Sequence, residues 1–166
     1  EYRRQRQMCI RDRLYTQSGA SLNEAKLLLE NNHQTNTPLY VDVLTDIASL
    51  ELMRSNPEKA NQALESALSI ARRLYGNTHQ EISTILMALT QSFLWQNKLD
   101  EALQSAREAM TITHEALPET HPDRALADFT LGDLLYRVGQ FAEASALVNQ
   151  SLKTQIILYL SLIHIS

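Results

Sequence analysis

Apolar residues recur along this chain at spacings of three and four, the period of one face of an α-helix. In residues 38–54, for example, they include Leu44, Ile47 and Ala48. Six segments share this period: residues 38–54, 57–74, 80–96, 99–116, 122–138 and 140–158. A leading helix at about 18–31 extends the pattern, so we expect an all-α chain of about seven helices.

The apolar positions also repeat over a longer interval of 42 residues. Sets in this register include Ala60, Ala102 and Ala144; Ile47, Leu89 and Leu131; Leu64, Ala106 and Val148; and Leu68, Met110 and Leu152. An interval of this size holds two antiparallel helices with their turns, which is typical of a helical repeat protein. We predict one array in residues 14–159, with a half repeat at 18–37 and repeats at 38–79, 80–121 and 122–158.

Helix starts are predicted by a Ser or Thr followed three residues later by an acidic residue, the signature of a capping box. The signature occurs at Thr78 with Glu81, Thr120 with Asp123, Ser21 with Glu24, and Ser55 with Glu58. His79 and His121 recur beside two of these caps, so we interpret them as turn residues rather than ligands.

Small residues at fixed places indicate how neighbouring hairpins pack. Ala60, Ala102 and Ala144 leave room for the adjacent backbone, and Gly132 and Ala48 do so on the first helix of a hairpin. Glu51 and Asp128 interrupt this scheme, because the register places both on the apolar face. Either they lie at frayed edges or the register slips there by one residue.

The motif Leu131-Gly132-x-x-Leu135-x-x-x-Gly139-x-Phe141-x-x-Ala144 resembles the consensus of the tetratricopeptide repeat family. The usual repeat of that family has about 34 residues, and the 42-residue interval here is similar to its kinesin-light-chain variety, which is widespread in bacteria. The resemblance covers about residues 18–158 and implies a right-handed α-solenoid of antiparallel helix hairpins.

The resemblance also implies that the first helices of the hairpins line a concave groove for a peptide or a partner helix. Residues four and seven apart share a helix face, which selects the lining in this sequence. The predicted groove residues are Thr45, Ser49, Leu52, Met87, Gln91, Leu94, Phe129, Asp133 and Tyr136, flanked by Met53, Trp95 and Arg137.

The predicted lining is mostly apolar and aromatic. Arg137 is its one cation, which disfavours the carboxylate clamp of some family members, and the paired Asn residues of the kinesin-light-chain type are absent. Met87, Trp95, Phe129 and Tyr136 therefore favour an amphipathic helix or an extended apolar peptide as ligand. A regulatory segment of a larger bacterial signalling enzyme or transcriptional regulator, such as a serine/threonine kinase, remains an alternative function.

Charge and motif content disfavour other classes. A net charge of −4 gives no broad basic field for nucleic acid, and no apolar stretch reaches the length of a membrane span. A single cysteine fits a reducing compartment, and we expect a cytoplasmic protein. The lone Cys9 excludes an internal disulfide. We find no nucleophile elbow, phosphate loop or metal-binding helix motif, and His114 and His121 lack a ligand spacing. The sequence predicts a non-enzyme without cofactor or metal.

The two ends differ from the periodic interior. Residues 1–13 and 160–166 resemble translated adapter sequence, and we expect both to be non-native in a chain that is a fragment. Near the second end, Ile156, Ile157, Leu158 and Leu160 offer apolar side chains through which copies of the chain could self-associate.

Overall fold

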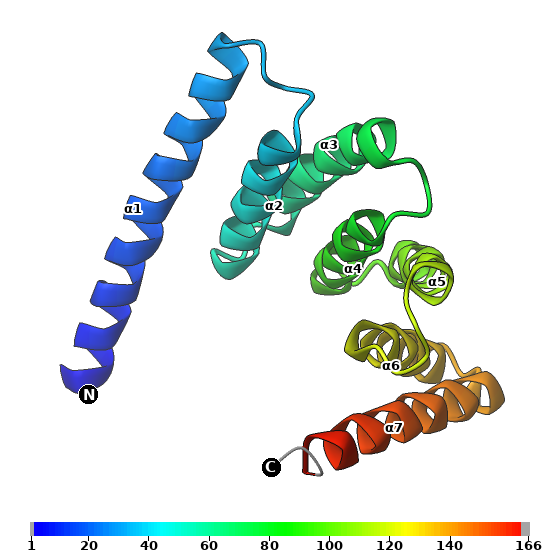
Figure 1. Cartoon of the computed structure of the whole chain (residues 1–166). Coiled ribbons are helices and arrows are strands. Elements are labelled where there is room, and N and C mark those ends of the chain that lie inside the picture. The colour runs from blue at the N-terminus through cyan, green and yellow to red at the C-terminus, as the bar shows by residue number, and fades with distance from the viewer. Residues whose placement is uncertain (1, 164–166) are drawn as a thin grey trace. The chain divides into compact units, whose positions relative to one another are not determined.

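The computed structural model describes the backbone of residues 2–163 and the side chains of residues 17–160. Every regular element in that part of the chain is a helix (Figure 1). The helices are α1 (Tyr2–Asn31), α2 (Pro38–Met53), α3 (Pro57–Tyr75), α4 (Gln80–Trp95), α5 (Leu99–Ala116), α6 (Pro122–Arg137) and α7 (Phe141–Ile163). The predicted all-α class with about seven helices is confirmed, and none of the helices described is both long and apolar enough to cross a membrane.

The helix starts follow the 42-residue interval. The first residues of α2, α4 and α6 lie 42 positions apart, and so do the first residues of α3, α5 and α7. Each pair, α2 with α3, α4 with α5 and α6 with α7, is joined by a turn of three residues. The boundaries of the array itself stay a prediction.

The first helix of each pair is capped by a residue in register: Thr37, His79 or His121. The Nδ1 atoms of His79 and His121 accept hydrogen bonds from the backbone N–H groups of Glu81 and Asp123, both at 3.2 Å. The prediction that Thr78 and Thr120 cap these helices is therefore wrong. The helix starts one residue later than the Thr signature indicates, and the imidazole reaches an otherwise unpaired N–H of the first turn.

The turn inside each pair uses a left-handed residue, again in register: Ser55 (φ 60°), Asn97 (φ 57°) and Gly139 (φ 82°). The N–H of each following residue bonds to a carbonyl five residues back, as at Asn56 and Glu51 (2.9 Å) and at Gln140 and Leu135 (2.8 Å). This hydrogen bond belongs to the motif that ends a helix at its C-terminus, and the motif requires a residue with a left-handed backbone conformation. Ser55 thus ends α2 rather than capping α3, contrary to the prediction.

The leading helix is longer than predicted, since α1 begins at Tyr2 and not near residue 18. Ser21, predicted to start it, lies inside α1 and donates its hydroxyl to the Gln17 carbonyl at 3.2 Å. A Ser in mid-helix satisfies its hydroxyl in this way, so the capping signature there was wrong. The predicted non-native ends, 1–13 and 160–166, fall almost wholly outside the described side chains.

The chain divides into two compact units after Ile70. In the first unit α1 packs on α2, and a Cβ added to Gly19 would lie 2.6 Å from an Arg54 nitrogen and 3.0 Å from a Leu50 carbon. The Tyr40 hydroxyl, carried by α2, donates to the Glu30 carboxylate of α1 at 2.7 Å. Burial, this hydrogen bond and the negative charge of Glu30 raise the pKa of Tyr40 to about 12.

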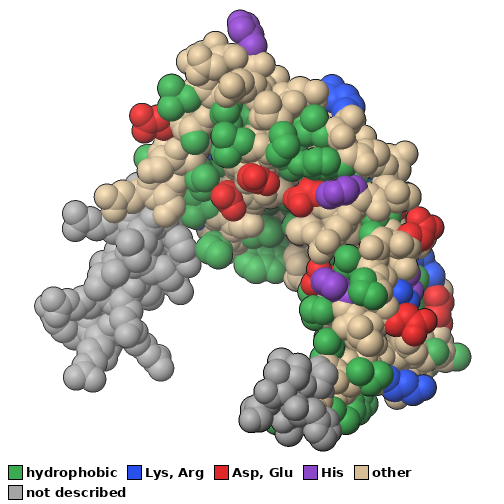
Figure 2. All heavy atoms as spheres, viewed as in Figure 1, with side chains coloured by type: hydrophobic (Ala, Val, Ile, Leu, Met, Phe, Trp, Pro, Cys, Tyr) green, Lys and Arg blue, Asp and Glu red, His purple; other side chains and the backbone are tan. Residues whose placement is uncertain are grey.

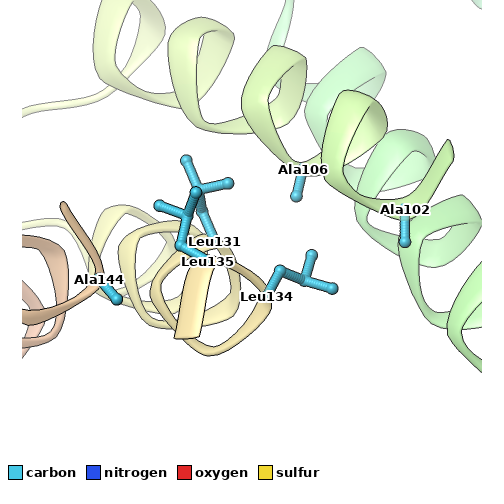
Figure 3. Packing of buried hydrophobic residues seen from close by; sticks show 6 residues of the cluster. All are labelled: Ala102, Ala106, Leu131, Leu134, Leu135 and Ala144. Carbon is cyan, nitrogen blue, oxygen red and sulfur yellow. The ribbon is translucent and has the colours of Figure 1, made fainter. Parts of the chain in front are cut away.

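In the second unit α4 packs on α5, α5 on α6 and α6 on α7. Figure 3 shows Leu131 and Leu135 of α6 pointing toward α5, where Ala106 lies, and Leu134 directed toward Ala102. All five side chains are buried. The alanines let α6 approach α5 closely, which confirms the predicted role of small residues at this contact.

Gly132 permits a second close approach, between α6 and α7. A Cβ added there would lie 2.9 Å from a Val148 methyl carbon and 3.3 Å from the Ala144 carbonyl oxygen. Both distances are shorter than ordinary van der Waals contact, so a side chain would push the two helices apart. The predicted role of Gly132 is therefore confirmed.

Asp128 is buried between α5 and α6, with 1 % of its surface exposed. Its Oδ1 atom lies 2.7 Å from Nε2 of His114 on α5. Glu51, half-buried at the end of α2, is paired with Arg54 and Asn56, both at 3.0 Å. The expectation of a frayed edge or a slipped register at Asp128 is wrong, because a partner on the neighbouring helix satisfies the carboxylate.

Candidate partner-binding surface

The second unit contains an open apolar cavity of about 420 Å³ between α6 and α7. It is lined by Phe129, Gly132, Asp133 and Tyr136 of α6 and by Phe141, Ala144, Ser145 and Val148 of α7. Three predicted groove residues, Phe129, Asp133 and Tyr136, are thus brought together here. We call this space the α6–α7 cavity.

The helix period explains this lining. Phe129, Asp133 and Tyr136 lie four and three residues apart and share one face of α6. On α7, Phe141, Ser145 and Val148 share a face in the same way, and the two helices run antiparallel. Between the aromatic walls, Gly132 and Ala144 carry little side-chain volume, so the surface is hollowed there.

The walls of the α6–α7 cavity are ordered by two contacts. The rings of Tyr136 and Phe141 meet edge to face, with centroids 5.3 Å apart and planes at 65°, an arrangement that aromatic pairs favour. The Asp133 carboxylate accepts a hydrogen bond from Nε of Arg137 at 2.8 Å. The acidic group at the cavity is therefore already neutralised, and the remaining surface suits apolar groups.

Met87, another predicted residue, lines a smaller cavity of about 180 Å³ in the same unit. Its lining comes from α4, α5 and α6 and includes Gln80, Ser83, Thr84, Met87, Thr113, Leu117, Asp123 and Leu126. The Gln80 side-chain amide donates to the Asp123 carboxylate at 3.0 Å, which links the starts of α4 and α6. The two first helices of this unit therefore border a common depression, as the predicted groove requires.

The other predicted residues of the second unit lie outside both cavities. Trp95 is 56 % exposed, so its side chain does not belong to the core. Gln91 and Arg137 are exposed as well. Leu94 differs from these, because it packs against the buried cluster formed by α5 and α6.

Thr45, Ser49 and Leu52 belong to the first unit. The Thr45 hydroxyl donates to the Asp42 carbonyl at 2.8 Å, and the Ser49 hydroxyl donates to the Thr45 carbonyl at 3.0 Å. Leu52 is half-buried. Both hydroxyls are bonded within their own helix, and the role of this set in binding stays a prediction.

Sequence reasoning missed the contribution of α7 to the larger cavity. It assigned Ala144 and Val148 to a core stripe by register with Ala102 and Ala106. The structure buries Ala144 but leaves Val148 37 % exposed. Ala106, the equivalent of Val148 on α5, is buried because α6 packs on it.

Charged side chains gather on another side of the second unit. Arg72 pairs with Glu108 at 2.6 Å, and Arg107 pairs with Glu143 at 2.9 Å, so α3 is tied to α5 and α5 to α7. The hydrogen bond from Arg107 holds the pKa of Glu143 below its usual value. Figure 2 shows acidic and basic side chains next to one another along the right-hand edge, where α5 and the start of α7 lie.

Three of the described histidines, His79, His114 and His121, have structural roles. His114 contacts Asp128, and His79 and His121 cap helices, with the His79 ring stacked on Tyr75 at 4.6 Å. Among the described residues no cluster of three or more His, Cys, Asp or Glu side chains is placed to hold a metal ion.

Comparison with known proteins gives a family and a fold. A family model described as tetratricopeptide repeat matches residues 43–115 and 81–155. The crystal structure of BtubC (BKLC) from P. vanneervenii is similar over 87 % of this chain, with a TM-score of 0.81 and 15 % identity. A putative kinesin light chain from Podospora anserina with nearly identical TPR-like repeats is similar over 85 % of this chain, with a TM-score of 0.70 and 17 % identity.

The TPR domain of Arabidopsis FLU is also similar, over 70 % of this chain and 95 % of its own length, with a TM-score of 0.59 and 19 % identity. No curated protein sequence matches the chain. The chain spans 58 % of the length of BtubC and 67 % of the Podospora protein. At these identities the likeness concerns the fold alone.

Proposed function

Because the chain belongs to the tetratricopeptide repeat family, we propose that it is a non-catalytic scaffold that holds a peptide or partner helix against the exposed faces of α4 and α6. Helical repeat proteins of this kind serve in general as protein-binding surfaces. The ligand-binding strip proposed here consists of Met87, Gln91, Trp95, Phe129, Asp133 and Tyr136, with Arg137 at its edge.

The observation that carries the proposal is the exposure of Phe129 and Tyr136. They lie seven residues apart on α6, so they share a face, and at least half of each side chain is exposed. Aromatic side chains on a rigid helix supply a large contact area at a low cost in conformational entropy. Such residues dominate the binding energy of many protein interfaces.

The charge pattern supports an apolar ligand over an acidic one. Arg137 is the cation of the strip, and its guanidinium is bonded to Asp133 at 2.8 Å. An incoming carboxylate would have to compete with Asp133 for this group. A ligand that presents apolar side chains to Met87, Phe129 and Tyr136 has no such competition.

The test begins with peptides selected from a displayed random library against the purified chain. Their affinity is then measured by fluorescence polarisation for the chain and for the double variant Met87→Glu/Phe129→Glu. We expect the double variant to lose at least ~30-fold in affinity, because two charges enter an apolar contact. Phe129→Glu alone, at an exposed position, is expected to lose about 10-fold.

Circular dichroism checks that the variants keep their helical content. The matched control is Ile157→Glu, which places the same charge at an exposed apolar residue of α7 away from the strip. It should bind the peptides as well as the unmodified chain does. Full affinity in the double variant would place the binding surface elsewhere. The alternative, a regulatory segment of a larger signalling enzyme, is tested by the sequence of the complete gene.

A further inference from the structure

The smaller cavity of the second unit, which we call the Met87 cavity, lies among three consecutive helices. It has a volume of about 180 Å³, and α4, α5 and α6 all contribute to its lining. Figure 1 shows these helices next to one another, with α7 packed on α6 beyond them. Because Met87 also belongs to the proposed ligand-binding strip, a ligand bound along the strip meets this cavity. The groups that line the cavity therefore select part of the ligand.

The hydroxyl groups of the lining have no hydrogen left for a ligand. Those of Ser83 and Thr113 contact each other, and both lie within hydrogen-bond distance of the Ala109 carbonyl, at 3.1 and 2.7 Å. Each hydroxyl has a single hydrogen, and every way of sharing these hydrogens among the three oxygens uses both. Thr84 donates its hydroxyl to the Gln80 carbonyl at 3.3 Å. All three hydroxyls therefore offer only lone pairs to a ligand.

Asp123 adds a carboxylate to the lining, and a carboxylate only accepts hydrogen bonds. Its Oδ2 atom accepts one from the Gln80 amide at 3.0 Å, and among the described residues no group donates to its Oδ1. The same bond fixes the orientation of the Gln80 amide, so the amide oxygen is a further acceptor. The second N–H of this amide is the one side-chain donor left in the lining. Acceptors thus prevail in the Met87 cavity.

The charges near the Met87 cavity favour a cation. Glu81 and Asp123 lie in the first turns of α4 and α6, and each offsets the partial positive charge of its helix start, about half a unit. Arg124 does not line the cavity, because its Nη1 donates to two carbonyl oxygens at the end of α5, at 3.1 and 3.3 Å. The Nδ1 atom of His121 accepts the Asp123 backbone N–H, so it has no proton for the carboxylate.

We propose that the Met87 cavity binds a basic side chain, lysine or arginine, of the peptide or helix held along the strip. The charged end donates to Asp123 and to the lone pairs beside it, while the methylene groups lie against Met87, Leu117 and Leu126. Leu126 is 55 % exposed and was not among the predicted groove residues. The inference rests on the proposed function, and it names a residue type that the ligand carries.

Other side chains satisfy the Met87 cavity less well. An apolar side chain would cover the Asp123 carboxylate without giving it a hydrogen bond, which is unfavourable. An acidic side chain would bring a second negative charge close to Asp123. An ammonium or guanidinium group brings several N–H donors and the opposite charge, so it matches both the acceptors and the carboxylate.

The experiment selects peptides from a displayed random library, once against the full chain and once against Asp123→Asn. At one position of the peptides selected by the chain, we expect lysine or arginine to be enriched at least ~5-fold. Asn keeps an acceptor for Gln80 but removes the charge, so this enrichment should disappear while the apolar residues of the peptides persist. Glu119→Gln is the matched control, because it removes the same charge from an exposed residue of the nearby connector. It should keep the enrichment.

Fluorescence polarisation with one selected peptide then measures the coupling. Replacing its basic residue by norleucine should weaken binding to the chain about 10-fold, and binding to Asp123→Asn less than ~3-fold. Asp123 is 48 % exposed, so the helical circular dichroism of the variant should persist. Selected peptides without an enriched basic residue, or equal losses for chain and variant, would overturn this inference and leave the proposed function intact. A library that yields no binding peptide would overturn both.

Discussion

The helices α5 and α7 are the second helices of the last two pairs, and they carry apolar faces in the same register. The face of α5 is mostly buried, whereas that of α7 is largely exposed. Ala106 is fully buried on α5, and Val148, its counterpart, is 37 % exposed on α7. Met110 packs against the core, while Leu152 is 53 % exposed. The amino acids at these places are apolar in both helices, so residue type does not cause the difference. What differs is the presence of α6 against α5.

This comparison shows that one apolar pattern is buried or exposed according to whether a neighbouring helix packs on it. Full burial of an aliphatic or aromatic side chain contributes roughly 1.5–3 kcal/mol relative to exposure. On α5 this stabilisation is realised within the fold. On α7 the same side chains are partly exposed, and this stabilisation is not realised within the described residues.

The largest effect should come from truncating the covered face. Leu131→Ala removes a fully buried side chain from the α5–α6 contact, and it should lower the free energy of unfolding by about 2–5 kcal/mol. Leu152→Ala on the open face should change it by less than ~1 kcal/mol. Urea unfolding followed by circular dichroism measures both. Equal losses at the two sites would show that α7 is covered in solution.

The polar contact of the covered face provides a second test. His114→Ala leaves the buried Asp128 carboxylate without its partner, and it should cost about 1–3 kcal/mol. The double variant His114→Ile/Asp128→Leu copies the chemistry of α7 at Ile156 and should restore most of the loss. Thermal unfolding measures the stability of the two variants. A double variant less stable than His114→Ala would show that an apolar pair cannot replace the polar contact between α5 and α6.

Each turn between paired helices contains a residue with a left-handed backbone conformation. Substitutions at this residue should change the stability according to whether the new residue tolerates that conformation. Gly139→Ala places a Cβ at φ 82° and should cost about 1 kcal/mol. Ser55→Gly relieves the same conformation in the first pair and should be neutral or stabilising by less than ~1 kcal/mol. Both values come from chemical unfolding. A destabilising Ser55→Gly would mean that the Ser55 side chain contributes beyond its conformation.

The smallest effect should come from the ion pair between α5 and α7. The pKa of Glu143 is lowered by Arg107, so the pair adds stability above the ordinary glutamate pKa, and this contribution is lost as pH falls through the lowered value. Arg107→Gln should therefore lower the midpoint of thermal unfolding slightly at pH 7, and by less as the pH falls below the ordinary glutamate pKa. Midpoints measured from pH 3 to 7 for both proteins check this. A difference between the two proteins that does not shrink from pH 7 to pH 3 would point to lost packing instead.

The sequence predicted the helices and much of their packing because the relevant signals are local. The interval between Pro38, Gln80 and Pro122 marks three helix starts, and Ala102 and Gly132 mark close contacts. The caps at His79 and His121 escaped prediction, since a Thr in the preceding position carries the stronger capping signature. Asp128 escaped it too, because its partner His114 lies on another helix, 14 residues earlier.

For the candidate site, spacing alone placed Phe129, Asp133 and Tyr136 on one face of α6, and the structure finds them around one cavity. Spacing could not show that Leu94, on the equivalent face of α4, packs against the core. The side chain at that position is Tyr136 in the following pair, where it stays exposed. The contact depends on which neighbouring helix reaches the residue, and periodicity carries no such information.

By itself, the sequence determined where the helices form, which of their faces are apolar and the 42-residue interval at which these features return, because all of these depend on residues close together along the chain. Only the tertiary structure decided which apolar faces are covered and which remain open. The face of α5 became core and the face of α7 became surface because burial requires a second helix at the right place, and that is a property of the packed molecule.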